Sequence, residues 1–313
     1  MKISKRRHLI SLSDMSDDEM AQLVKCGLWY AQNGTAAKKP LSGLLIGIYF
    51  LKTSTRTRTS FSSAALRLGA QIISYGSSDL QENTGETMED TGRVLSRMLD
   101  GIVMRTAGCE SRLRTFASFN SMSVVNAMTA NEHPTQALAD LTTMVQHFGD
   151  FKGLRVLYLG EGNNTAAALA LSLPRFAGTE LYFCTPRGYG IPAETMEAAR
   201  QYAKKHGTNV TEQHDLKNLP GEFDVIYTTR WETTGTSKSD PHWKDIFKPF
   251  KVTQSLIDRY PSAIFMHDLP AHREEEVDAS VLDGNRSIAF TQAENKMHSA
   301  CAVLEWCLKP GSI

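Results

Sequence analysis

Short apolar runs alternate along the chain with segments whose apolar residues recur at helical spacing. Residues 44–51 form a nearly continuous apolar run, which is typical of a strand buried on both faces. In the following segment, Phe61, Ala64 and Leu68 recur about three or four positions apart and predict a helix over 60–68. A buried strand followed directly by a helix is the repeating unit of parallel sheets, so this region predicts an α/β fold.

The same alternation restarts in the second half of the chain. Further strands are predicted at 155–159, 181–185, 224–228 and 264–267. The segment 150–153 precedes this restart, so we expect a first domain over residues 1–150 and a second over residues 151–292. A final segment, about 293–310, predicts a closing helix.

Composition narrows the functional classes. The chain has 313 residues, enough for two hydrophobic cores, and its 34 basic and 34 acidic residues leave no formal net charge. The sequence contains no long basic block and no apolar run of membrane-spanning length. We therefore expect no nucleic acid and no membrane among its partners.

The cysteines and histidines indicate neither a disulfide framework nor a metal centre. Five cysteines are scattered along the chain, an odd number that suits free thiols in a reducing compartment. The N-terminus turns polar before any hydrophobic span, so we expect no secretory leader and a cytoplasmic location. His267 and His272 are separated by a predicted strand end and turn, not by a zinc-ligand spacing, so we expect no metal and no cofactor.

The segment that joins the first predicted strand to its helix carries hydroxyl and guanidinium groups. Its residues are Ser54, Thr55, Arg56, Thr57 and Arg58. Backbone N–H groups at a helix N-terminus and the helix dipole favour an oxyanion, which an arginine can bind through two hydrogen bonds. The segment therefore predicts a phosphate site, and the alternative is an ordinary capped helix with solvated arginines. It lacks the glycines of a nucleotide P-loop.

A second polar cluster, at 131–140, opens another helix. Pro134 suits the first helical turn, where a missing N–H costs little. His133 offers a proton donor and Gln136 offers an amide. An isolated histidine is more often structural than catalytic, but the occurrence of both clusters in this order favours a functional site.

Together the two clusters resemble the signatures of the aspartate/ornithine carbamoyltransferase family. Residues 54–58 are similar to its carbamoyl phosphate loop, and residues 133–136 to its second signature. Further similar segments follow the family's order over essentially the whole chain, at 6–12, 85–91, 103–106, 158–164, 267–273 and 292–298. The last three resemble the ornithine branch more than the aspartate branch. The resemblance implies an α/β fold of two doubly wound parallel-sheet domains, one for carbamoyl phosphate and one for an amino acid, linked by interdomain helices. The closing helix would then pack on the first domain.

The resemblance also implies a reaction. An uncharged amine attacks the carbonyl carbon of carbamoyl phosphate and gives a ureido product and phosphate, by positioning and electrostatic stabilisation. By resemblance, the catalytic residues are Arg56, Arg105 and His133. The carbamoyl phosphate-binding residues are Ser54, Thr55, Arg56, Thr57, Arg105, His133, Gln136 and Lys296, the last standing where the family usually has arginine. Arg58 is either part of this site or a partner in a structural ion pair.

The expected acceptor site departs from the ornithine pattern. Thr229 stands where ornithine enzymes have an aspartate, and Thr233 and Thr234 replace their Ser-Met pair. Arg230 falls where aspartate enzymes place a carboxylate-binding arginine, although it could also face solvent. Asp268 replaces a cysteine and would act as a general base or bind a second cationic group. The expected acceptor-binding residues are Asn163, Asn164, Thr229, Arg230, Thr233, Thr234, Asp268 and Leu269.

The loop at 79–84 aligns with a loop that, in this family, reaches the site of a neighbouring subunit. Gln81 is the candidate for that contact, and the alternative is an exposed, flexible loop. The resemblance thus implies a homotrimer with shared active sites.

We predict a carbamoyltransferase of amino-acid metabolism whose acceptor is an ornithine-related or shorter diamino acid, such as 2,3-diaminopropionate. Ornithine itself is the first alternative and aspartate the next. A catalytically silent protein that binds carbamoyl phosphate or a partner is an alternative of another class. The glycines at 160 and 162 give only a weak dinucleotide signal, because the third glycine of that motif is missing.

Overall fold

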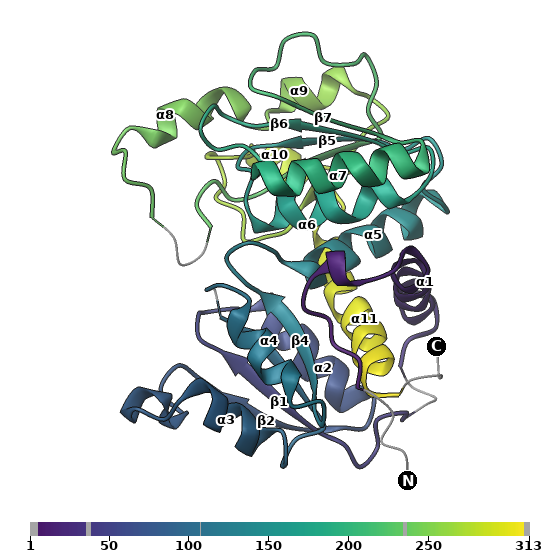
Figure 1. Cartoon of the computed structure of the whole chain (residues 1–313). Helices are drawn as coiled ribbons and strands as arrows, with labels where there is room; N and C mark the ends of the chain where they lie inside the picture. The colour runs from purple at the N-terminus through teal and green to yellow at the C-terminus, as the bar shows by residue number, and fades with distance from the viewer. Residues whose placement is uncertain (1–5, 36–38, 107, 234–236, 310–313) are drawn as a thin grey trace. The chain divides into compact units, whose positions relative to one another are not determined.

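The computed structural model describes residues 6–35, 39–106, 108–233 and 237–309. Its chain divides into two compact units, the first comprising Met1–Thr142 with Glu294–Ile313 and the second Thr143–Ala293. Each unit contains one parallel sheet flanked by helices (Figure 1), which confirms the predicted α/β fold with two parallel-sheet domains. The domain boundary predicted at residues 150 and 151 lies in the loop after α5 (Pro134–Phe148) and stays a prediction.

The first unit is built on a four-stranded parallel sheet in the order β2-β1-β3-β4. Its strands are β1 (Leu45–Phe50), β2 (Gln71–Tyr75), β3 (Gly101–Arg105) and β4 (Ser123–Met128). The helices of this part of the chain are α1 (Asp17–Asn33), α2 (Arg56–Arg67), α3 (Met88–Leu95), α4 (Ser111–Ser118), α5 and α11 (Ala289–Leu308), with short 3-10 turns η1 (Leu12–Asp14) and η2 (Gln81–Thr84).

The strands of this sheet differ in burial. β1, β3 and β4 are buried at almost every position, as parallel strands covered on both faces are. The strand predicted at 44–51 is therefore confirmed as β1. β3 and β4 were not predicted, although they are buried. β2, at the sheet edge, is mostly exposed or half-buried and was not predicted either.

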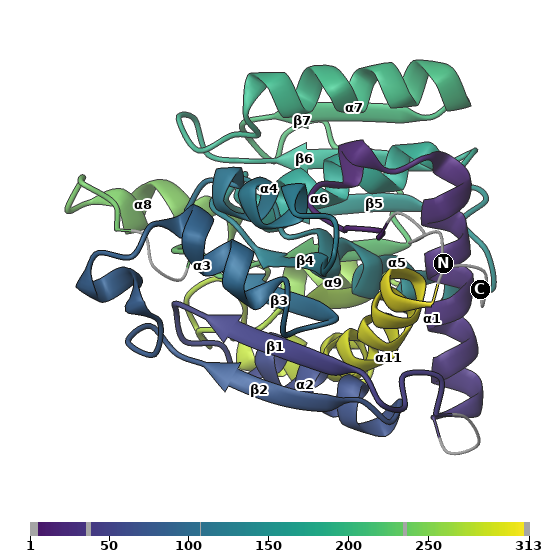
Figure 2. The same ribbon diagram turned by 60° about the horizontal axis from the view of Figure 1, so that its bottom comes forward.

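Two helices far apart in sequence pack together in the first unit. Figure 2 shows α1 and α11 side by side, and the Tyr30 hydroxyl of α1 donates a 2.5 Å hydrogen bond to Glu305 of α11. A Cβ on Gly27 would lie 2.7 Å from Thr142 Oγ1 of α5 and 3.6 Å from the Cα of Ser299 of α11, so the absence of a side chain lets α1 approach both helices closely. The closing helix from Glu294 onward thus belongs to the first unit.

The second unit is built on a five-stranded parallel sheet in the order β7-β6-β5-β8-β9. Its strands are β5 (Arg155–Leu159), β6 (Glu180–Cys184), β7 (Asn209–Gln213), β8 (Val225–Thr228) and β9 (Ile264–His267). Its helices are α6 (Asn164–Ser172), α7 (Ala193–His206), α8 (Trp243–Phe247), α9 (Gln254–Arg259) and α10 (Ala279–Leu282), with 3-10 turns η3 (Leu173–Arg175) and η4 (Lys248–Phe250). The four strands predicted here are confirmed; the polar edge strand β7 was not predicted.

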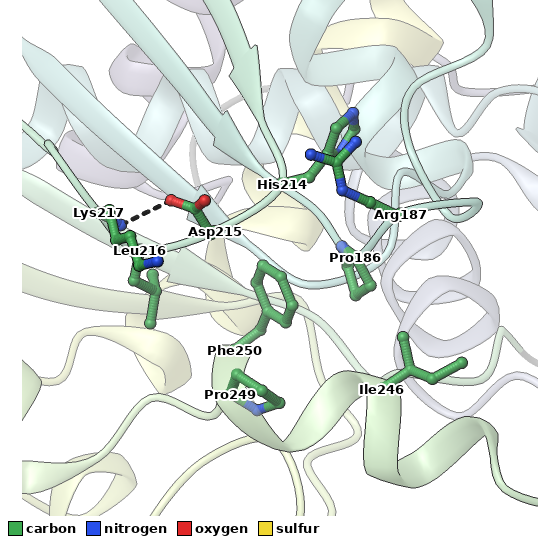
Figure 3. Close-up of a pocket in the computed structure, with 9 residues that line it drawn as sticks. All are labelled: Pro186, Arg187, His214, Asp215, Leu216, Lys217, Ile246, Pro249 and Phe250. Atoms are coloured by element: carbon green, nitrogen blue, oxygen red, sulfur yellow. Dashed lines mark hydrogen bonds between the residues drawn. The ribbon is translucent and has the colours of Figure 1, made fainter.

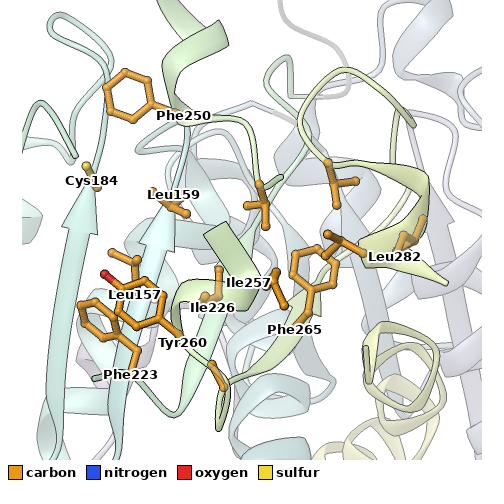
Figure 4. Packing of buried hydrophobic residues seen from close by; sticks show 14 of the residues in the cluster. Leu157, Leu159, Cys184, Phe223, Ile226, Phe250, Ile257, Tyr260, Phe265 and Leu282 are labelled. Carbon is orange, nitrogen blue, oxygen red and sulfur yellow. The ribbon is translucent and has the colours of Figure 1, made fainter. Parts of the chain in front are cut away.

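One core of the second unit lies between the sheet and its later helices (Figure 4). Leu157, Ile226 and Phe265, from three neighbouring strands, pack with Ile257 of α9 and Leu282 of α10. Alternate positions of β5 face opposite sides of a sheet, so Tyr158 lies on the other face, where its ring contacts those of Phe183 and Tyr227. Among the helices of the described residues, none is long and apolar enough to cross a membrane.

Candidate functional site

In the first unit, three candidate segments meet at the carboxyl ends of the strands. Arg105 ends β3 and is paired in register with Phe50, the last residue of β1. The Leu51 N–H donates to the Arg105 carbonyl at 3.0 Å, so the loop after β1 lies beside Arg105. On its other side, Arg105 pairs with Met128 of β4. The register of β3 against β4 shifts just before this pair, and Met128 adopts a φ of +146°. Ligands of parallel α/β sheets bind at such carboxyl ends.

The helix after β1 begins earlier than its apolar pattern predicted. α2 starts at Arg56, so Arg56 and Thr57 lie in its first turn and Thr55 occupies the N-cap position. Thr55 has helical backbone angles and its side chain makes no capping hydrogen bond. The side chain of Thr55 thus provides no cap of the kind expected in an ordinary capped helix, and α2 follows directly on the loop that carries Ser54. Arg58 is exposed and forms no ion pair within 4.0 Å with a described carboxylate.

His133 is buried beside two cationic side chains. It is 4% exposed, and its Nδ1 lies 3.3 Å from the Thr135 hydroxyl. Burial lowers the pKa of His133 well below its ordinary value of 6.5, and the charges of Lys296 and Arg105 lower it further. The imidazole is thus neutral at physiological pH. When Thr135 donates to Nδ1, the opposite nitrogen carries the proton and can donate to an oxygen.

Lys296 reaches this group from α11. Its ammonium, on a side chain that is buried, donates a short hydrogen bond to the Gln136 carbonyl oxygen. The Gln136 amide in turn donates to Asp140 Oδ1 at 2.7 Å. The structure therefore brings Lys296, Gln136, His133 and Arg105 together in the first unit, as predicted from residues that are far apart in sequence.

Glu132 is a functional candidate that the sequence analysis missed. Its carboxylate accepts hydrogen bonds from Ser11 Oγ at 2.6 Å and from the Leu12 N–H at 2.8 Å. Burial raises the pKa of Glu132 from 4.5 to about 7 despite these donors. Glu132 thereby holds the segment at Ser11 and Leu12 next to His133. In the sequence, its position beside that histidine is the one feature that indicates a functional role.

In the second unit, Asp268 is the centre of a hydrogen-bonded group at the carboxyl ends of β5, β8 and β9. Thr165 Oγ1 donates to Asp268 Oδ2 at 2.9 Å, and Thr229 Oγ1 lies 3.0 Å from Oδ1 and 3.1 Å from Oδ2. Asn163 Nδ2 approaches Thr229 Oγ1 at 3.4 Å. The side-chain oxygen of Asn163 caps α6 by accepting from the backbone N–H of Thr165 at 3.0 Å. The predicted Asn163, Thr229 and Asp268 thus lie together, and Thr165 was missed.

The negative charge of Asp268 has no cationic partner in the described part of the chain. His267 Nδ1 lies 3.4 Å from Asp268 Oδ1, but it accepts the Leu269 N–H at 2.8 Å and so carries no proton. His267 Nε2 donates to Glu276 at 3.1 Å, which fixes this tautomer. No lysine or arginine of the described residues lies within 4.0 Å of the Asp268 carboxylate. With 15% of its side chain exposed, Asp268 can accept a cationic ligand group.

The other predicted acceptor residues differ from one another in their surroundings. Arg230 lies 3.7 Å from Glu232, and its buried Nε has no hydrogen-bond partner among the described residues. Leu269 has a φ of +53°, a conformation that is strained for a branched side chain. Asn164 is buried at the first position of α6. Thr234 lies outside the described residues.

Two other features of the second unit contain none of the predicted site residues. A pocket of about 560 Å³ follows the carboxyl ends of β6 and β7 (Figure 3). It is lined by Pro186, Arg187, His214, Asp215, Leu216, Lys217, Ile246, Pro249 and Phe250. The second feature is a group of possible metal ligands, His272, Glu275 and Glu276, within 4.8 Å of one another. Glu275 is already paired with Lys244 at 2.8 Å, and Glu276 Oε1 accepts from the backbone N–H of His272 at 2.5 Å.

Comparisons with known proteins agree along the whole chain. Residues 7–146 match a family model described as the carbamoyl-P binding domain of aspartate/ornithine carbamoyltransferase, and residues 152–307 match its Asp/Orn binding domain. An ornithine carbamoyltransferase of Caldicellulosiruptor saccharolyticus is 37% identical over 301 residues, covering 95% of this chain and 97% of that protein. One from Methanobrevibacter smithii is 35% identical over 305 residues, covering 96% and 99%. A solved ornithine carbamoyltransferase from Pyrococcus furiosus has a TM-score of 0.91 at 35% identity and covers 98% of each chain.

Proposed function

The chain belongs to the aspartate/ornithine carbamoyltransferase family, and we propose that it carbamoylates the side-chain amine of an ornithine-related or shorter diamino acid. It is a carbamoyltransferase that uses carbamoyl phosphate and an amino acid, and therefore an enzyme of amino-acid metabolism. The identity of the acceptor and the roles of single residues are the proposed part.

The first unit would bind carbamoyl phosphate. The phosphate would occupy the N-terminus of α2, where Ser54, Thr55, Arg56 and Thr57 lie at the positive end of the helix dipole. Arg105, at the neighbouring strand end, would bridge the phosphate and the carbonyl oxygen. Arg105 and Lys296 both lie close to His133, and their positive charges suit a dianionic phosphate.

His133 would stabilise the charge that develops on the carbonyl oxygen. The amine nitrogen forms a bond to the carbonyl carbon, the bond from that carbon to the phosphate oxygen breaks, and the phosphate leaves with the electron pair and accepts the amine proton. A neutral imidazole that donates a hydrogen bond stabilises the oxyanion of the intermediate. The lowered pKa of His133 favours this neutral form.

The observation that supports a diamino acid is the uncompensated carboxylate of Asp268. Two threonine hydroxyls already donate to it, and an α-ammonium group would supply the missing positive charge. This arrangement favours substrate binding over the general-base alternative for Asp268. Arg230, whose Nε lacks a partner among the described residues, would bind the α-carboxylate. The side-chain amine is then left to attack.

Ornithine is the competing acceptor. The relatives that cover nearly the whole chain are named ornithine carbamoyltransferases, and ornithine carries the same ammonium and carboxylate groups. It differs from the shorter diamino acids in the distance between the α-carbon and the attacking amine.

An acceptor panel tests the proposal directly. Ureido product and phosphate would be measured with carbamoyl phosphate and ornithine, 2,4-diaminobutyrate, 2,3-diaminopropionate, lysine, putrescine or aspartate. We expect a diamino acid to give the highest kcat/KM, and putrescine, which lacks the carboxylate, to be poor. A preference for ornithine selects the competing acceptor, and a preference for aspartate or putrescine contradicts the assigned roles of Asp268 and Arg230.

We also propose a cytoplasmic homotrimer in which Gln81 contacts a neighbouring subunit's site. Gln81 lies exposed at the start of η2, where its side-chain oxygen accepts a local 2.7 Å hydrogen bond from Thr84. Glu82, the next residue, is paired with Arg112 of α4, which fixes the turn to the first unit while Gln81 faces outward. An exposed amide on an anchored turn is suited to contact another subunit.

A further inference from the structure

A lysine that the sequence analysis did not single out is buried in the second unit. The side chain of Lys238 is only 6% exposed, and its ammonium donates a short hydrogen bond to Glu161 Oε1. Burying an ammonium group is unfavourable unless it is paired. The position of Lys238 is therefore determined by its partners and not by solvent.

Three aromatic rings surround the same ammonium group. Lys238 Nζ lies 4.7 Å from the centroid of Tyr189, 5.3 Å from that of Trp243 and 5.1 Å from that of Phe247. The faces of aromatic rings attract a cation, most strongly when it is desolvated. Phe247 also contacts the ring of Trp231, the neighbour of Arg230, with centroids 5.5 Å apart.

Glu161 connects Lys238 with the proposed acceptor residues. It follows β5, and its second carboxylate oxygen accepts a 3.3 Å hydrogen bond from Thr233. Its carbonyl accepts the Tyr158 hydroxyl at 3.0 Å, which holds the turn after β5 in place. Two residues later in that turn, Asn163 approaches Thr229. Glu161 and Asn163 therefore join the turn after β5 to both ends of segment 229–233, and Lys238 pairs with Glu161.

We propose that Lys238 is a positioning residue that fixes segment 229–233 and thereby sets the affinity for the acceptor amino acid. Segment 229–233 carries Thr229 and Arg230, so its placement determines where the acceptor carboxylate and ammonium are bound. Lys238 does not touch the reacting atoms in this scheme; it acts through Glu161 and the aromatic rings. The part that concerns affinity rests on the proposed function.

The variants separate a positioning role from a purely stabilising one. Lys238→Met removes the charge and keeps the length of the side chain, and Glu161→Gln removes the partner charge while Lys238 stays. Lys238→Arg retains a cation and tests for rescue. Lys244→Met is the matched control, because Lys244 Nζ lies 5.7 Å from the same Trp243 ring but its side chain is 52% exposed.

Two measurements are made on each variant. Amide hydrogen exchange of the peptide that covers 229–233 reports the placement of the segment without any substrate. Steady-state kinetics report KM for the acceptor and for carbamoyl phosphate. We expect faster exchange and an acceptor KM raised about tenfold in Lys238→Met and Glu161→Gln, with kcat and the KM for carbamoyl phosphate within about twofold of wild type. The double variant should be no worse than either single one, because the residues act as a pair.

Three results overturn the inference. Unchanged exchange in Lys238→Met and Glu161→Gln shows that Lys238 does not fix the segment. Faster exchange with an unchanged acceptor KM refutes the effect on affinity, as does an equal effect in Lys244→Met. A wild-type enzyme that carbamoylates no amino acid of the panel contradicts the proposed function, while the exchange data still decide whether Lys238 holds segment 229–233.

Discussion

At the scale of single residues, the neutral state of His133 has a measurable consequence. Burial and two neighbouring cations lower its pKa well below 6.5, so its protonation does not occur near neutral pH. We expect His133→Ala to lower kcat about a hundredfold or more, with a smaller effect on KM, because the variant loses one oxyanion donor. In the wild type, kcat should show no protonation step of this histidine between about pH 6 and 8. A step near pH 6.5 that disappears in the variant would contradict the neutral assignment.

Asp268 gives a prediction about charge. Asp268→Asn keeps an oxygen that can accept the hydroxyls of Thr165 and Thr229 but removes the negative charge. We expect the KM for a diamino acid to rise about thirtyfold or more, because a buried ammonium loses its counterion, while the KM for carbamoyl phosphate stays the same. Asp245→Asn, at an exposed aspartate paired with Lys248, is the control. An unchanged acceptor KM in Asp268→Asn would exclude the ammonium contact.

Glu132 couples stability to pH. Its pKa in the folded protein, about 7, lies above its ordinary value of 4.5 because burial disfavours the charged form. A raised carboxyl pKa gives stability that is complete below the unfolded pKa and is lost as the pH rises through the folded pKa. The unfolding free energy of the wild type minus that of Glu132→Gln should therefore fall by roughly 2 to 3 kcal/mol between about pH 5 and pH 8. Chemical denaturation at both pH values measures this difference, and a constant difference contradicts the raised pKa.

Residues whose role depends on distant partners are the ones that the sequence did not reveal. Arg56, Arg105 and His133 belong to local motifs with a recognisable order, so they could be predicted before the fold was known. Lys238 stands in a polar segment typical of solvent-exposed loops. Only the fold brings the rings of Tyr189, Trp243 and Phe247 around it. Spacing along one segment does not carry that information.

At the scale of elements, burial on both faces helps prediction but does not ensure it, because β3 and β4 are buried and were not predicted. β1, β5, β8 and β9 read as apolar runs, because helices cover both sides of a parallel sheet. β2 and β7 lie at sheet edges and carry polar residues, so their sequences do not differ clearly from those of loops. The early start of α2 was missed for a related reason, since its first turn contains only polar side chains.

The two kinds of helix N-terminus in the first unit lead to opposite predictions. Ser16 caps α1 through a capping box with Glu19, whereas the Thr55 side chain makes no capping bond at α2. Ser16→Ala should lower the unfolding free energy by about 1 kcal/mol and leave KM values unchanged. Thr55→Ala should change stability by less than about 0.5 kcal/mol but raise the KM for carbamoyl phosphate about tenfold. Denaturation and steady-state kinetics on the pair would contradict this assignment if the two effects were exchanged.

At the scale of the whole molecule, the two units contribute different chemistry. The first gathers cations and a helix N-terminus, which suit a phosphate, and the second gathers a carboxylate and hydroxyls, which suit an ammonium group. The order of the motifs along the chain was enough to predict this division. It left the acceptor open between ornithine and a shorter diamino acid. In the proposed scheme selectivity depends on how Asp268, Arg230 and their neighbours are placed, and residues from three strand ends determine that placement.

The proposed trimer leads to a quantitative test of shared sites. Gln81 is exposed, and among the described residues its side chain hydrogen-bonds only with nearby Thr84, so Gln81→Ala should leave the subunit stable. If Gln81 serves a neighbour's site, a trimer mixed from Gln81→Ala and His133→Ala subunits contains one site in which both residues are native. Random mixing of equal amounts should then restore about a quarter of the wild-type activity, although each variant alone is nearly inactive. The measurement is the activity of the co-refolded mixture beside that of each variant refolded alone. Activity equal to the average of the two variants would mean that each site is complete within one subunit.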